Sequence, residues 1–530
     1  MRAGVSRGGD FRARRDARKV DEFHRGERRV FPEGLNAVGA AVVAALVLTS
    51  TFALRAETDA DAELQYQLGS LLFDETRYHE AIDAFDQAMR AADQALATRA
   101  RRAKVRAALR VAEFGIARET AEALAVQPDA ESVAVYGDAL WASGRFEEAD
   151  AAYLRAAQRA PDSARARYGR ARTLGALSRL DEALDSALAA SAASPRDGEI
   201  WALVSELYER LYRYDDAALA LRSYINLLPN RERSQKAAWA RAQADFLESF
   251  TGVTPVDIDA ADREVLHTLP FRLVNDKVIV RARINGSGAQ DFVLDTGSEE
   301  TIISAETARR EQVRPVTTTV SAGVGEVGMR GLQLARLRTL QLGTLDVRNV
   351  PVLVKSPELR GMPRREGESF SPLALGLSMM IDYERRTLTI GSRLPPMDAD
   401  YRLPMRMNRL AMVRGLLNER HPAYFVVDTG GEVISISSDT AQALPPSAYR
   451  RIPLRVWGTS GWDRDAFLLP GVNLDFDRLE YRNFPLVVLN LRAPSLLLGF
   501  QLGGIVGHKF LSPYRVAMDL VGSELRLQKF

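Results

Sequence analysis

The chain has 530 residues, of which 46% are hydrophobic and 26% charged, and this ordinary globular composition excludes wholesale disorder and fibrous repeats. At roughly 150 residues per domain, the length predicts three or four units. Because cysteine is absent, disulfide scaffolds, thiol catalysis, iron–sulfur clusters and cysteine-based zinc sites are excluded. The net charge of +2 is too balanced to indicate nucleic acid as a partner of the whole chain.

Histidine is also scarce, with five residues and no two of them within five positions of each other. The sequence therefore holds no local zinc motif, and neither a metal nor another cofactor is expected. It also contains no P-loop, no HExxH and no GxSxG segment. Carboxylates are left as the leading candidates for any catalysis.

The N-terminus begins with a basic tail at residues 1–34, which holds ten Lys/Arg against six Asp/Glu and leaves 61 against 63 for the rest. Residues 35–54 carry no charge, and twenty helical residues span about 30 Å, the thickness of a bilayer's hydrocarbon core. The flank after this segment is acidic. This charge asymmetry predicts a single-pass bacterial inner-membrane protein, anchored in the lipid bilayer by residues 35–54, with a cytoplasmic N-terminus and periplasmic C-terminal domains.

A cleaved signal peptide is the alternative for the same apolar segment. Thr51, Phe52 and Ala53 form a weak small-residue cleavage site of the kind that ends such signals. The basic tail that precedes the segment is long for a signal, which favours an uncleaved transmembrane helix.

A repeat with a period of thirty-four follows. Four segments share one pattern, and successive alanines of this pattern are separated by two periods, one period and one period. Proline follows three of these alanines after twelve positions, where it ends a helix because it lacks a backbone donor. A small residue precedes three of them by twelve, where helices must approach closely. The alanines are Ala81, Ala149, Ala183 and Ala217, the prolines Pro161, Pro195 and Pro229, and the small residues Gly69, Gly137 and Ala171.

This pattern resembles the tetratricopeptide family, with about five repeats and a capping helix from Ser234 in residues 60–249. The resemblance implies a solenoid of helix pairs in which Phe85 and Tyr153 fill the gaps between neighbouring repeats. In this family the concave surface binds peptides or partner proteins, so the solenoid is expected to recruit a substrate or a protein partner.

After a predicted linker at 250–264, the sequence changes to short β-rich segments separated by glycine and predicts an all-β half. Within it, Asp-Thr-Gly occurs twice, beginning at Asp295 and Asp428. Each aspartate lies ten positions after an asparagine and three after a phenylalanine, and each is followed at nearly the same separation by a matching Arg-Asn segment, at Arg348 and Arg482. One β unit is therefore present twice, in predicted lobes at 265–395 and 396–530.

The duplicated unit resembles the retropepsin-like aspartic proteases, fused in tandem as in the two-lobed pepsin architecture, over residues 270–530. The resemblance implies that each lobe supplies one catalytic aspartate, Asp295 and Asp428. Carboxylates about 3 Å apart cannot both ionise, so the pair shares one proton and acts on a water held between them. The residues expected to support the two loops are Thr296 and Thr429, which would cross-brace them, with Gly297, Ser298, Gly430 and Gly431.

The resemblance also implies substrate-binding residues. Glu299 and Glu432 match an acidic position that contacts substrate backbone in retroviral relatives. Gly376 and Gly507 lie in matched turns, but the first lobe looks shorter after its glycine, because Asp382 follows Gly376 by only six positions whereas Asp519 follows Gly507 by twelve. The segments expected to form flaps over the substrate contain Gly323 and Gly325 in the first lobe and Trp457, Gly458, Gly461 and Trp462 in the second.

Two functions are open from the sequence. The first is a membrane-anchored aspartic endopeptidase whose tetratricopeptide arm recruits a substrate or partner. The second is a scaffold of the same folds that binds peptides without cleaving them. The presence of both Asp-Thr-Gly segments favours the enzyme.

Overall fold

The computed structural model describes residues 59–530, apart from residues 233, 325–328, 356–366, 446–449 and 459. The predicted cytoplasmic tail at 1–34 and the predicted span at 35–54 lie outside the described residues. Among the described helices, none combines the length and the apolar character that crossing a bilayer requires. The predicted single-pass inner-membrane location is therefore not supported, and we withdraw it.

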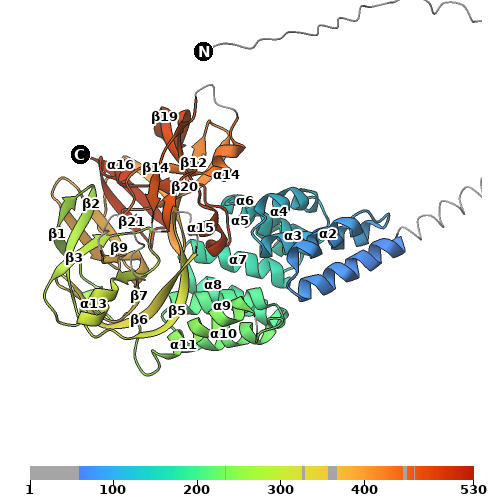
Figure 1. Cartoon of the computed structure of the whole chain (residues 1–530), viewed down its shortest axis with the longest axis horizontal. Helices are drawn as coiled ribbons and strands as arrows, with labels where there is room; N and C mark the ends of the chain where they lie inside the picture. The colour runs from blue at the N-terminus through green and yellow to red at the C-terminus, as the bar shows by residue number, and fades with distance from the viewer. Residues whose placement is uncertain (1–58, 233, 325–328, 356–366, 446–449, 459) are drawn as a thin grey trace, which may run out of the picture. The chain divides into compact units, whose positions relative to one another are not determined.

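The N-terminal half is a stack of antiparallel helix pairs, coloured blue to green in Figure 1. Residues 59–74 are helical and pair with α2, and four further pairs and the single helix α11 follow. Helices α6, α8 and α10 end two positions before the three prolines that predicted their ends. The helices are α2 Tyr78–Ala88, α3 Gln94–Arg110, α4 Phe114–Ala121 with the 3₁₀ turn η1 Glu122–Leu124, α5 Ala130–Ala142, α6 Phe146–Arg159, α7 Ala164–Ala176, α8 Leu180–Ala193, α9 Gly198–Arg210, α10 Tyr214–Leu227 and α11 Gln235–Glu248.

Glycines set how closely these helices pack. A Cβ placed on Gly69 would lie 2.7 Å from the ring of Phe85, and one placed on Gly137 would lie 2.6 Å from the ring of Tyr153. Gly169 contacts the other side of Tyr153, where a Cβ would lie 2.0 Å from the ring. Each aromatic ring therefore occupies the space that a neighbouring glycine leaves open, as the repeat pattern predicted.

The C-terminal half is all-β, and the first of its two lobes follows the short helix α12 Ala260–Arg263. Both lobes repeat one order of elements, in which a strand ending at Asp-Thr-Gly is followed by a short strand, a short helix and a long hairpin. The first lobe contains β1 His267–Val274, β2 Lys277–Ile284, β3 Gln290–Leu294, β4 Thr301–Ile303, α13 Ala305–Arg310, β5 Pro315–Ala322, β6 Met329–Leu342, β7 Leu345–Val354, β8 Ser369–Phe370, η2 Leu373–Leu375, β9 Ser378–Asp382 and β10 Thr387–Gly391.

The second lobe follows the same order, and its described residues also form the β16–β17 hairpin and helix α15. Its elements are β11 Tyr401–Asn408, β12 Leu410–Leu417, β13 His421–Val427, β14 Ile434–Ser437, α14 Ser438–Ala443, β15 Ile452–Pro453, β16 Val456–Gly458, β17 Gly461–Asp463, β18 Phe467–Phe476, β19 Leu479–Leu489, α15 Arg492–Leu498, β20 Gly504–Val506, α16 His508–Leu511, β21 Tyr514–Asp519 and β22 Glu524–Lys529.

A sheet shared between the lobes joins them. Its strands follow the order β1–β10–β9–β21–β22–β11, and every neighbouring pair is antiparallel. The two lobes meet where β9 pairs with β21 and Met380 lies opposite Ala517. On either side of this pair the strands match in order, with β10 and β1 in the first lobe corresponding to β22 and β11 in the second. This symmetry fits the duplication predicted from the sequence.

The matched asparagines explain part of the sequence register between the lobes. Asn285 and Asn418 adopt positive φ angles of 51° and 46° in equivalent turns, and Asn349 and Asn483 adopt 51° and 49°. Asparagine tolerates this left-handed conformation better than other non-glycine residues, because its short side chain hydrogen-bonds locally. Asn285 accepts hydrogen bonds from the backbone of Arg338 and Thr339 in this way.

Part of the segment predicted as a linker belongs to the first lobe. Val256 and Ile258 are 0% and 4% exposed and lie in the core of the lobes. Between them, Asp257 forms a bridge with Arg348 of β7, where it donates and accepts a backbone hydrogen bond. Alternating apolar and charged residues therefore make this segment an extra edge of the lobe.

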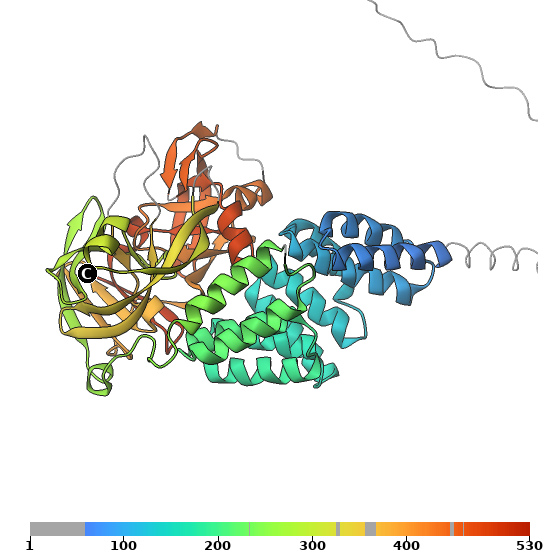
Figure 2. The ribbon, with the colours of Figure 1, turned by 60° about the horizontal axis from the view of Figure 1, so that its bottom comes forward.

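The helical half, which we call the arm, packs directly on both lobes, and together they form one compact unit at residues 59–530 (Figures 1 and 2). On the second lobe, the ring of Phe146 lies 4.6 Å from that of Tyr424 and 5.2 Å from that of Phe500. On the first lobe, α11 packs against β5, and the guanidinium of Arg336 lies 5.4 Å from the ring of Phe250. The arm and the lobes thus share buried apolar surface.

Candidate active site

Both Asp-Thr-Gly loops begin where a buried strand ends. Asp295 follows β3, and its backbone N–H donates to the carbonyl of Phe370 in the parallel strand β8, at 2.9 Å. Asp428 follows β13, and its N–H donates to the carbonyl of Val506 in the parallel strand β20, at 3.0 Å. The two aspartates are therefore held by equivalent backbone contacts in the two lobes.

The threonines cross-brace the loops in the way the resemblance implied. The Thr296 hydroxyl donates to the carbonyl of Val427 at 2.5 Å and accepts from the N–H of Thr429 at 3.1 Å. The Thr429 hydroxyl donates to the carbonyl of Leu294 at 2.7 Å and accepts from the N–H of Thr296 at 3.1 Å. Both threonines are buried, so this network fixes the two loops against each other at the interface between the lobes.

The two carboxyl groups are hydrogen-bonded to each other, and each also receives N–H groups of its own loop. Gly297 donates to Asp295 Oδ1 at 3.1 Å, and Gly430 and Gly431 donate to Asp428 Oδ1 at 2.8 and 3.0 Å. This arrangement brings together two aspartates that lie far apart in the chain.

The close approach of the two carboxyl groups requires glycine at positions 297 and 430. A Cβ on Gly297 would lie 2.5 Å from Cγ of Asp428, and one on Gly430 would lie 2.8 Å from Oδ1 of Asp295. Each glycine therefore faces the aspartate of the opposite lobe. Any side chain at either position would occupy the space of the carboxyl pair.

The surroundings hold a proton on this pair. Burial, and then the charge of Asp295, raise the pKa of Asp428 to about 7. Burial also raises the pKa of Asp295, while the positive charge of Lys355 opposes that rise. Since neighbouring carboxylates repel each other, the pair titrates as a unit that retains one shared proton over the acidic range.

Two further residues of the loops make different contacts. The Ser298 hydroxyl donates to the carbonyl of Glu300 at 2.8 Å. Gly431 has no hydroxyl at the corresponding position, and it packs against Gly507, where a Cβ would lie 2.7 Å from the carbonyl carbon and oxygen of Gly431.

The structural counterpart of Gly507 is Ser371 rather than Gly376. Ser371 follows Phe370 and Gly507 follows Val506, the two residues whose carbonyls hold the aspartates. Asp382 follows Ser371 by eleven positions, close to the twelve that separate Asp519 from Gly507, so the first lobe is not shortened here. Gly376, with φ +67°, instead ends the turn η2 and contacts Tyr212 of the arm.

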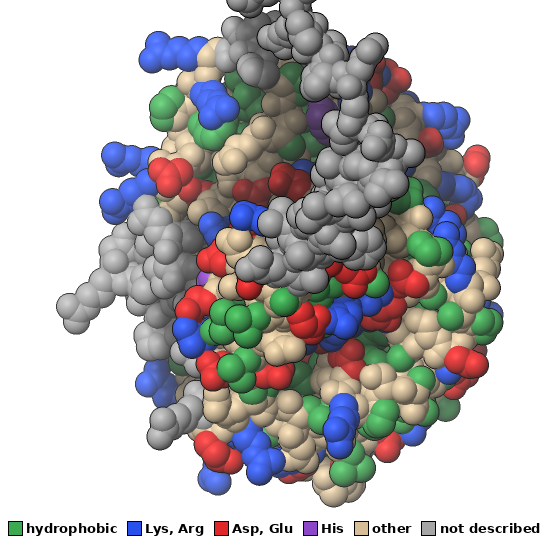
Figure 3. All heavy atoms as spheres, turned by 90° about the vertical axis from the view of Figure 1, so that its right-hand side faces the viewer, with side chains coloured by type: hydrophobic (Ala, Val, Ile, Leu, Met, Phe, Trp, Pro, Cys, Tyr) green, Lys and Arg blue, Asp and Glu red, His purple; other side chains and the backbone are tan. Residues whose placement is uncertain are grey.

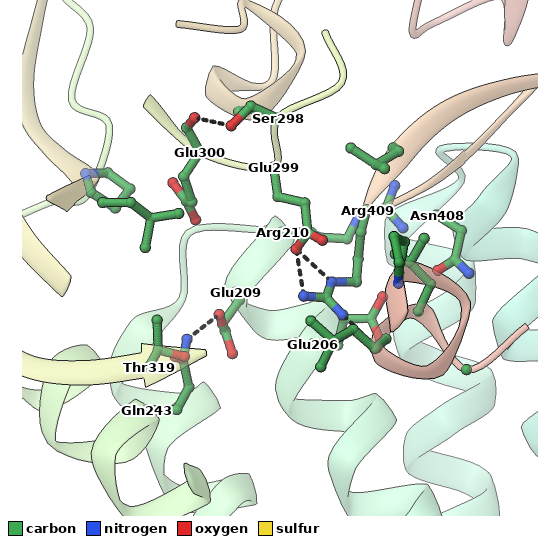
Figure 4. A pocket seen from close by; sticks show the side chains of 18 of the residues that line it. Glu206, Glu209, Arg210, Gln243, Ser298, Glu299, Glu300, Thr319, Asn408 and Arg409 are labelled. Atoms are coloured by element: carbon green, nitrogen blue, oxygen red, sulfur yellow. Dashed lines mark hydrogen bonds and ion pairs between the residues drawn. The ribbon is translucent and has the colours of Figure 1, made fainter. Parts of the chain in front are cut away.

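The two predicted substrate-contacting glutamates differ in their surroundings. Glu299 is paired with Arg409, whose Nε lies 2.7 Å from the Glu299 carboxylate (Figure 4). Glu432 is exposed, and its backbone carbonyl accepts from the N–H of Lys509 at 3.0 Å. The carboxylate of Glu299 thus connects the first loop to Arg409 of the second lobe.

The described parts of the two predicted flap segments contact each other. The N–H of Ser460 donates to the carbonyl of Val324 at 2.9 Å, and the N–H of Gly323 donates to the Ser460 hydroxyl at 3.1 Å. A Cβ on Gly458 would lie 2.0 Å from the carbonyl oxygen of Val324, so only glycine fits there.

The second-lobe segment forms the β16–β17 hairpin, in which Trp457 is paired with Trp462 and Gly458 with Gly461. Trp457, Gly458 and Gly461 line the cavity that is described next, together with Ser460. Gly325 of the first-lobe segment lies outside the described residues.

A cavity of about 1770 Å³ extends from Asp295 to the arm. Near the first Asp-Thr-Gly loop it is lined by Ser298, Glu299 and Glu300, and opposite them by Glu206, Glu209 and Arg210 of α9 (Figure 4). Burial raises the pKa of Glu209 to about 7, and burial together with Glu209 raises the pKa of Glu300. One wall of this cavity is thus made by the arm.

Sequence reasoning missed the charged residues that come from outside the Asp-Thr-Gly segments. Lys355, Arg409, Glu209 and Arg210 lie on different elements, and no local motif connects them. The sequence did distinguish Glu300, because the second loop has the apolar Val433 at the equivalent position. An ionisable residue where the duplicate is apolar is a sign of a role particular to one lobe.

Within the described residues, no group of three or more histidine or carboxylate side chains is arranged to hold a metal ion. The arrangement at the dyad suits direct activation of water, because one carboxyl can accept a proton while the other donates one.

Comparison with protein families finds two matches. The family described as gag-polyprotein putative aspartyl protease matches residues 280–380, which contain Asp295 but not Asp428. The tetratricopeptide repeat matches residues 62–94 and 130–163. No curated protein matches the chain.

Among solved structures, the chain is similar to TTC0263, a thermophilic TPR protein in Thermus thermophilus, at 20% identity and a TM-score of 0.30, covering 34% of this chain and 98% of that one. It is similar to the aspartic proteinase from Irpex lacteus at 13% identity and a TM-score of 0.31, covering 50% and 97%. It is also similar to YrrB, a TPR protein with an unusual peptide-binding site, at 18% identity and a TM-score of 0.21, covering 34% and 92%. Similarities of this size carry no functional argument.

The predicted fold class is confirmed: a helical, tetratricopeptide-like region precedes an all-β region that resembles an aspartic protease. The family matches support an aspartyl protease domain together with tetratricopeptide repeats, which are typical of protein or peptide binding. They do not support the predicted membrane anchor or a contact with a lipid bilayer.

Proposed function

We propose that the chain is an aspartic endopeptidase that hydrolyses peptide bonds with Asp295 and Asp428 as one catalytic pair. The observation that carries this proposal is the pair itself: two hydrogen-bonded carboxyl groups, one from each lobe, with raised pKa values and glycines packed against them. A pure peptide-binding scaffold would not require glycines that face the carboxyl groups of the opposite lobe.

The reaction follows from the shared proton. The ionised carboxylate takes a proton from water while the water oxygen attacks the peptide carbonyl carbon, and the protonated carboxyl gives its proton to the carbonyl oxygen. The resulting gem-diol intermediate collapses when the carboxyl that received the water proton passes it to the amide nitrogen, while the other carboxylate takes a proton back from one hydroxyl of the intermediate. The carbon–nitrogen bond then breaks, the products are a carboxylic acid and an amine, and the pair is returned to its starting state.

The supporting groups keep this chemistry in place. Thr296 and Thr429 hold the two loops in register, which positions the carboxyl groups. Lys355 favours the ionised form of Asp295, while burial and the charge of Asp295 favour the protonated form of Asp428. The two lobes thus offer the acid and the base that hydrolysis needs.

The arm, in this proposal, binds a substrate or partner protein, as its tetratricopeptide repeats indicate. The contacts of Phe146 and α11 with the lobes hold its concave side next to the catalytic cavity.

The test is a degenerate peptide library incubated with the protein between pH 3 and 7, with products identified by mass spectrometry in water enriched in ¹⁸O. We expect internal cleavage, with one ¹⁸O in each new carboxyl group, for the wild type and no cleavage for Asp295→Asn or Asp428→Asn. Peptide binding without cleavage at every pH would identify the chain as a scaffold. Cleavage that survives either substitution would refute the shared pair.

A further inference from the structure

The catalytic cavity continues into the concave face of the arm. The same cavity that contains Asp295 is lined farther away by Trp141 of α5, Arg172 of α7 and Trp239 of α11. Its volume of about 1770 Å³ exceeds the range of about 300–1,000 Å³ that is usual for small-molecule pockets. The space therefore suits a polypeptide segment longer than the few residues that a catalytic cleft alone would hold.

Contacts with the second lobe also hold the arm in a fixed position. Phe146 of α6 is buried among aromatic residues of the second lobe, and the N–H of Gln501 donates to the carbonyl of Ala142 at 2.8 Å. The hydroxyl of Ser523 donates to the carbonyl of Leu177 at 2.6 Å. Because these contacts lie at the ends of α5 and α7, the concave face is held as a wall of the cavity and is not a separate module on a linker.

Positive charge gathers on the distal part of this wall. Four arginines, which we call the arginine cluster, share three carboxylates, and Lys236 of α11 adds a further cation. The cluster consists of Arg106, Arg110, Arg165 and Arg172, and its partners are Asp138, Asp197 and Glu199. Acidic and basic side chains are interspersed on the face shown in Figure 3. On the cavity wall, by contrast, four cations face two anions, namely Arg110, Arg165, Arg172 and Lys236 against Asp138 and Glu199.

Of the four arginines in the cluster, Arg172 has the weakest pairing with carboxylates. Its guanidinium stacks 4.4 Å from the ring of Trp141 and 5.4 Å from that of Tyr168. Among the described residues, its one carboxylate within 4 Å is Asp138, at 3.9 Å, and Asp138 is already bound by Arg165 at 2.6 Å. A guanidinium that is stacked on aromatic rings and weakly paired retains donors for a further anionic group.

Lys236 supports the same conclusion. It lines the same cavity, and its ammonium lies 5.7 Å from the ring of Tyr78. Desolvation lowers the pKa of Lys236, and the nearby charge of Arg110 adds to this lowering. An incoming carboxylate would relieve this repulsion.

We propose that the concave face of the arm and the catalytic cleft form one substrate-binding site, and that its substrates are extended polypeptide segments with acidic residues several positions away from the scissile bond. The acidic part lies against Arg172 and Lys236, while the scissile bond lies at Asp295. This inference rests on the proposed peptidase function, and it adds the substrate class to it.

The experiment uses three synthetic peptide pools that share one degenerate eight-residue segment. The first pool has no extension, the second carries a twelve-residue Gly/Ser/Glu tail, and the third carries a Gly/Ser/Lys tail, with the tails placed at either end. We expect the wild type to cleave the acidic-tailed pool with a KM about tenfold below that of the short pool, and to lose this preference at high salt.

Variants assign the effect to the arm. Arg172→Gln and Lys236→Gln should raise KM for the acidic-tailed pool several-fold, without changing kcat or the cleavage of the short pool. Arg155→Gln is the matched control, because it removes an exposed arginine of α6 that does not line the cavity. Unchanged cleavage of the short pool shows that the variants are folded.

The outcomes separate the two proposals. Cleavage of all three pools with equal KM would overturn the extended site and leave the peptidase intact. If no pool is cleaved, the peptidase proposal fails. Binding of fluorescein-labelled pools to the Asp295→Asn protein then tests the extended binding site separately. Tighter binding of the acidic-tailed pool, weakened by Arg172→Gln, would support the site, and equal binding of the three pools would overturn it.

Discussion

At the scale of single residues, Gly297 and Gly430 explain why the two Asp-Thr-Gly segments tolerate no larger third residue. Each glycine faces the carboxyl group of the other lobe, at distances of 2.5 and 2.8 Å from a Cβ placed there. Their requirement is steric, because neither has a positive φ angle. They fix how closely the two aspartates approach.

Replacing Gly297 with alanine should therefore abolish cleavage without unfolding the lobes. The added methyl would collide with Cγ of Asp428 and force the carboxyl groups apart, so we expect a loss of kcat of at least about a hundredfold. Gly288→Ala is the control, since no atom lies within 4 Å of a Cβ at that turn. Cleavage by Gly297→Ala at the rate of the control would contradict the geometry.

The raised pKa of Asp428 predicts how stability varies with pH. A carboxyl with a folded pKa of about 7, above its unfolded value of about 4, stabilises the fold fully below pH 4 and loses this contribution as pH rises toward 7. Asp428→Asn removes the group that titrates. We therefore expect the melting temperature of this variant to rise relative to the wild type between pH 4 and 8, as measured by differential scanning fluorimetry.

Other groups contribute to the pH dependence of the wild type, which is why the difference between the two proteins is the quantity to measure. Asp295, Glu209 and Glu300 have raised pKa values, and Glu199 has a lowered one. A difference in melting temperature that stays constant across this range would show that Asp428 does not hold a proton in the folded state.

At the scale of elements, the contact between α6 and the second lobe holds the arm in place. Phe146 is 2% exposed, and its ring lies 4.6 Å from both Trp141 and Tyr424. Edge-to-face aromatic pairs add about 0.5–1.5 kcal/mol to the gain from burial. The ring of Phe146 therefore ties α5 and α6 of the arm to the second lobe.

Phe146→Ala should loosen this contact, with a loss of about 3–5 kcal/mol in the free energy of unfolding. The matched control is Leu219→Ala on α10, which removes a side chain that is 67% exposed and should cost less than about 0.5 kcal/mol. Urea unfolding followed by far-ultraviolet circular dichroism measures both. Equal midpoints for the two variants would show that the arm is not fastened through Phe146.

At the scale of the whole molecule, much of the architecture could be predicted from periodicity. The repeat period placed the helix ends at Pro161, Pro195 and Pro229, and the matched asparagines aligned the two lobes. Both signals are local, since a helix break or a left-handed turn is imposed by the residue itself. The structure brings Asp295 and Asp428 together as the duplication predicted.

The parts that escaped prediction depend on packing between distant segments. The match of Gly376 with Gly507 failed because Ser371 occupies the equivalent backbone position, and only the hydrogen bond of Asp295 with Phe370 shows this. The wall that α9 contributes to the cavity at Asp295 could not be foreseen either, since docking of the arm rests on scattered aromatic residues. The inner-membrane location was inferred from residues 1–55, and the described helices gave it no support.

The central claim is that Asp295 and Asp428 act as one unit in peptide hydrolysis. It is tested most directly by kcat/KM for the wild type, Asp295→Asn, Asp428→Asn and the double variant on one cleaved peptide. Residues that act as a unit are strongly non-additive, so we predict that each single variant loses at least about a thousandfold and that the double variant loses no more. Single losses that are small and multiply in the double variant would contradict a shared catalytic pair.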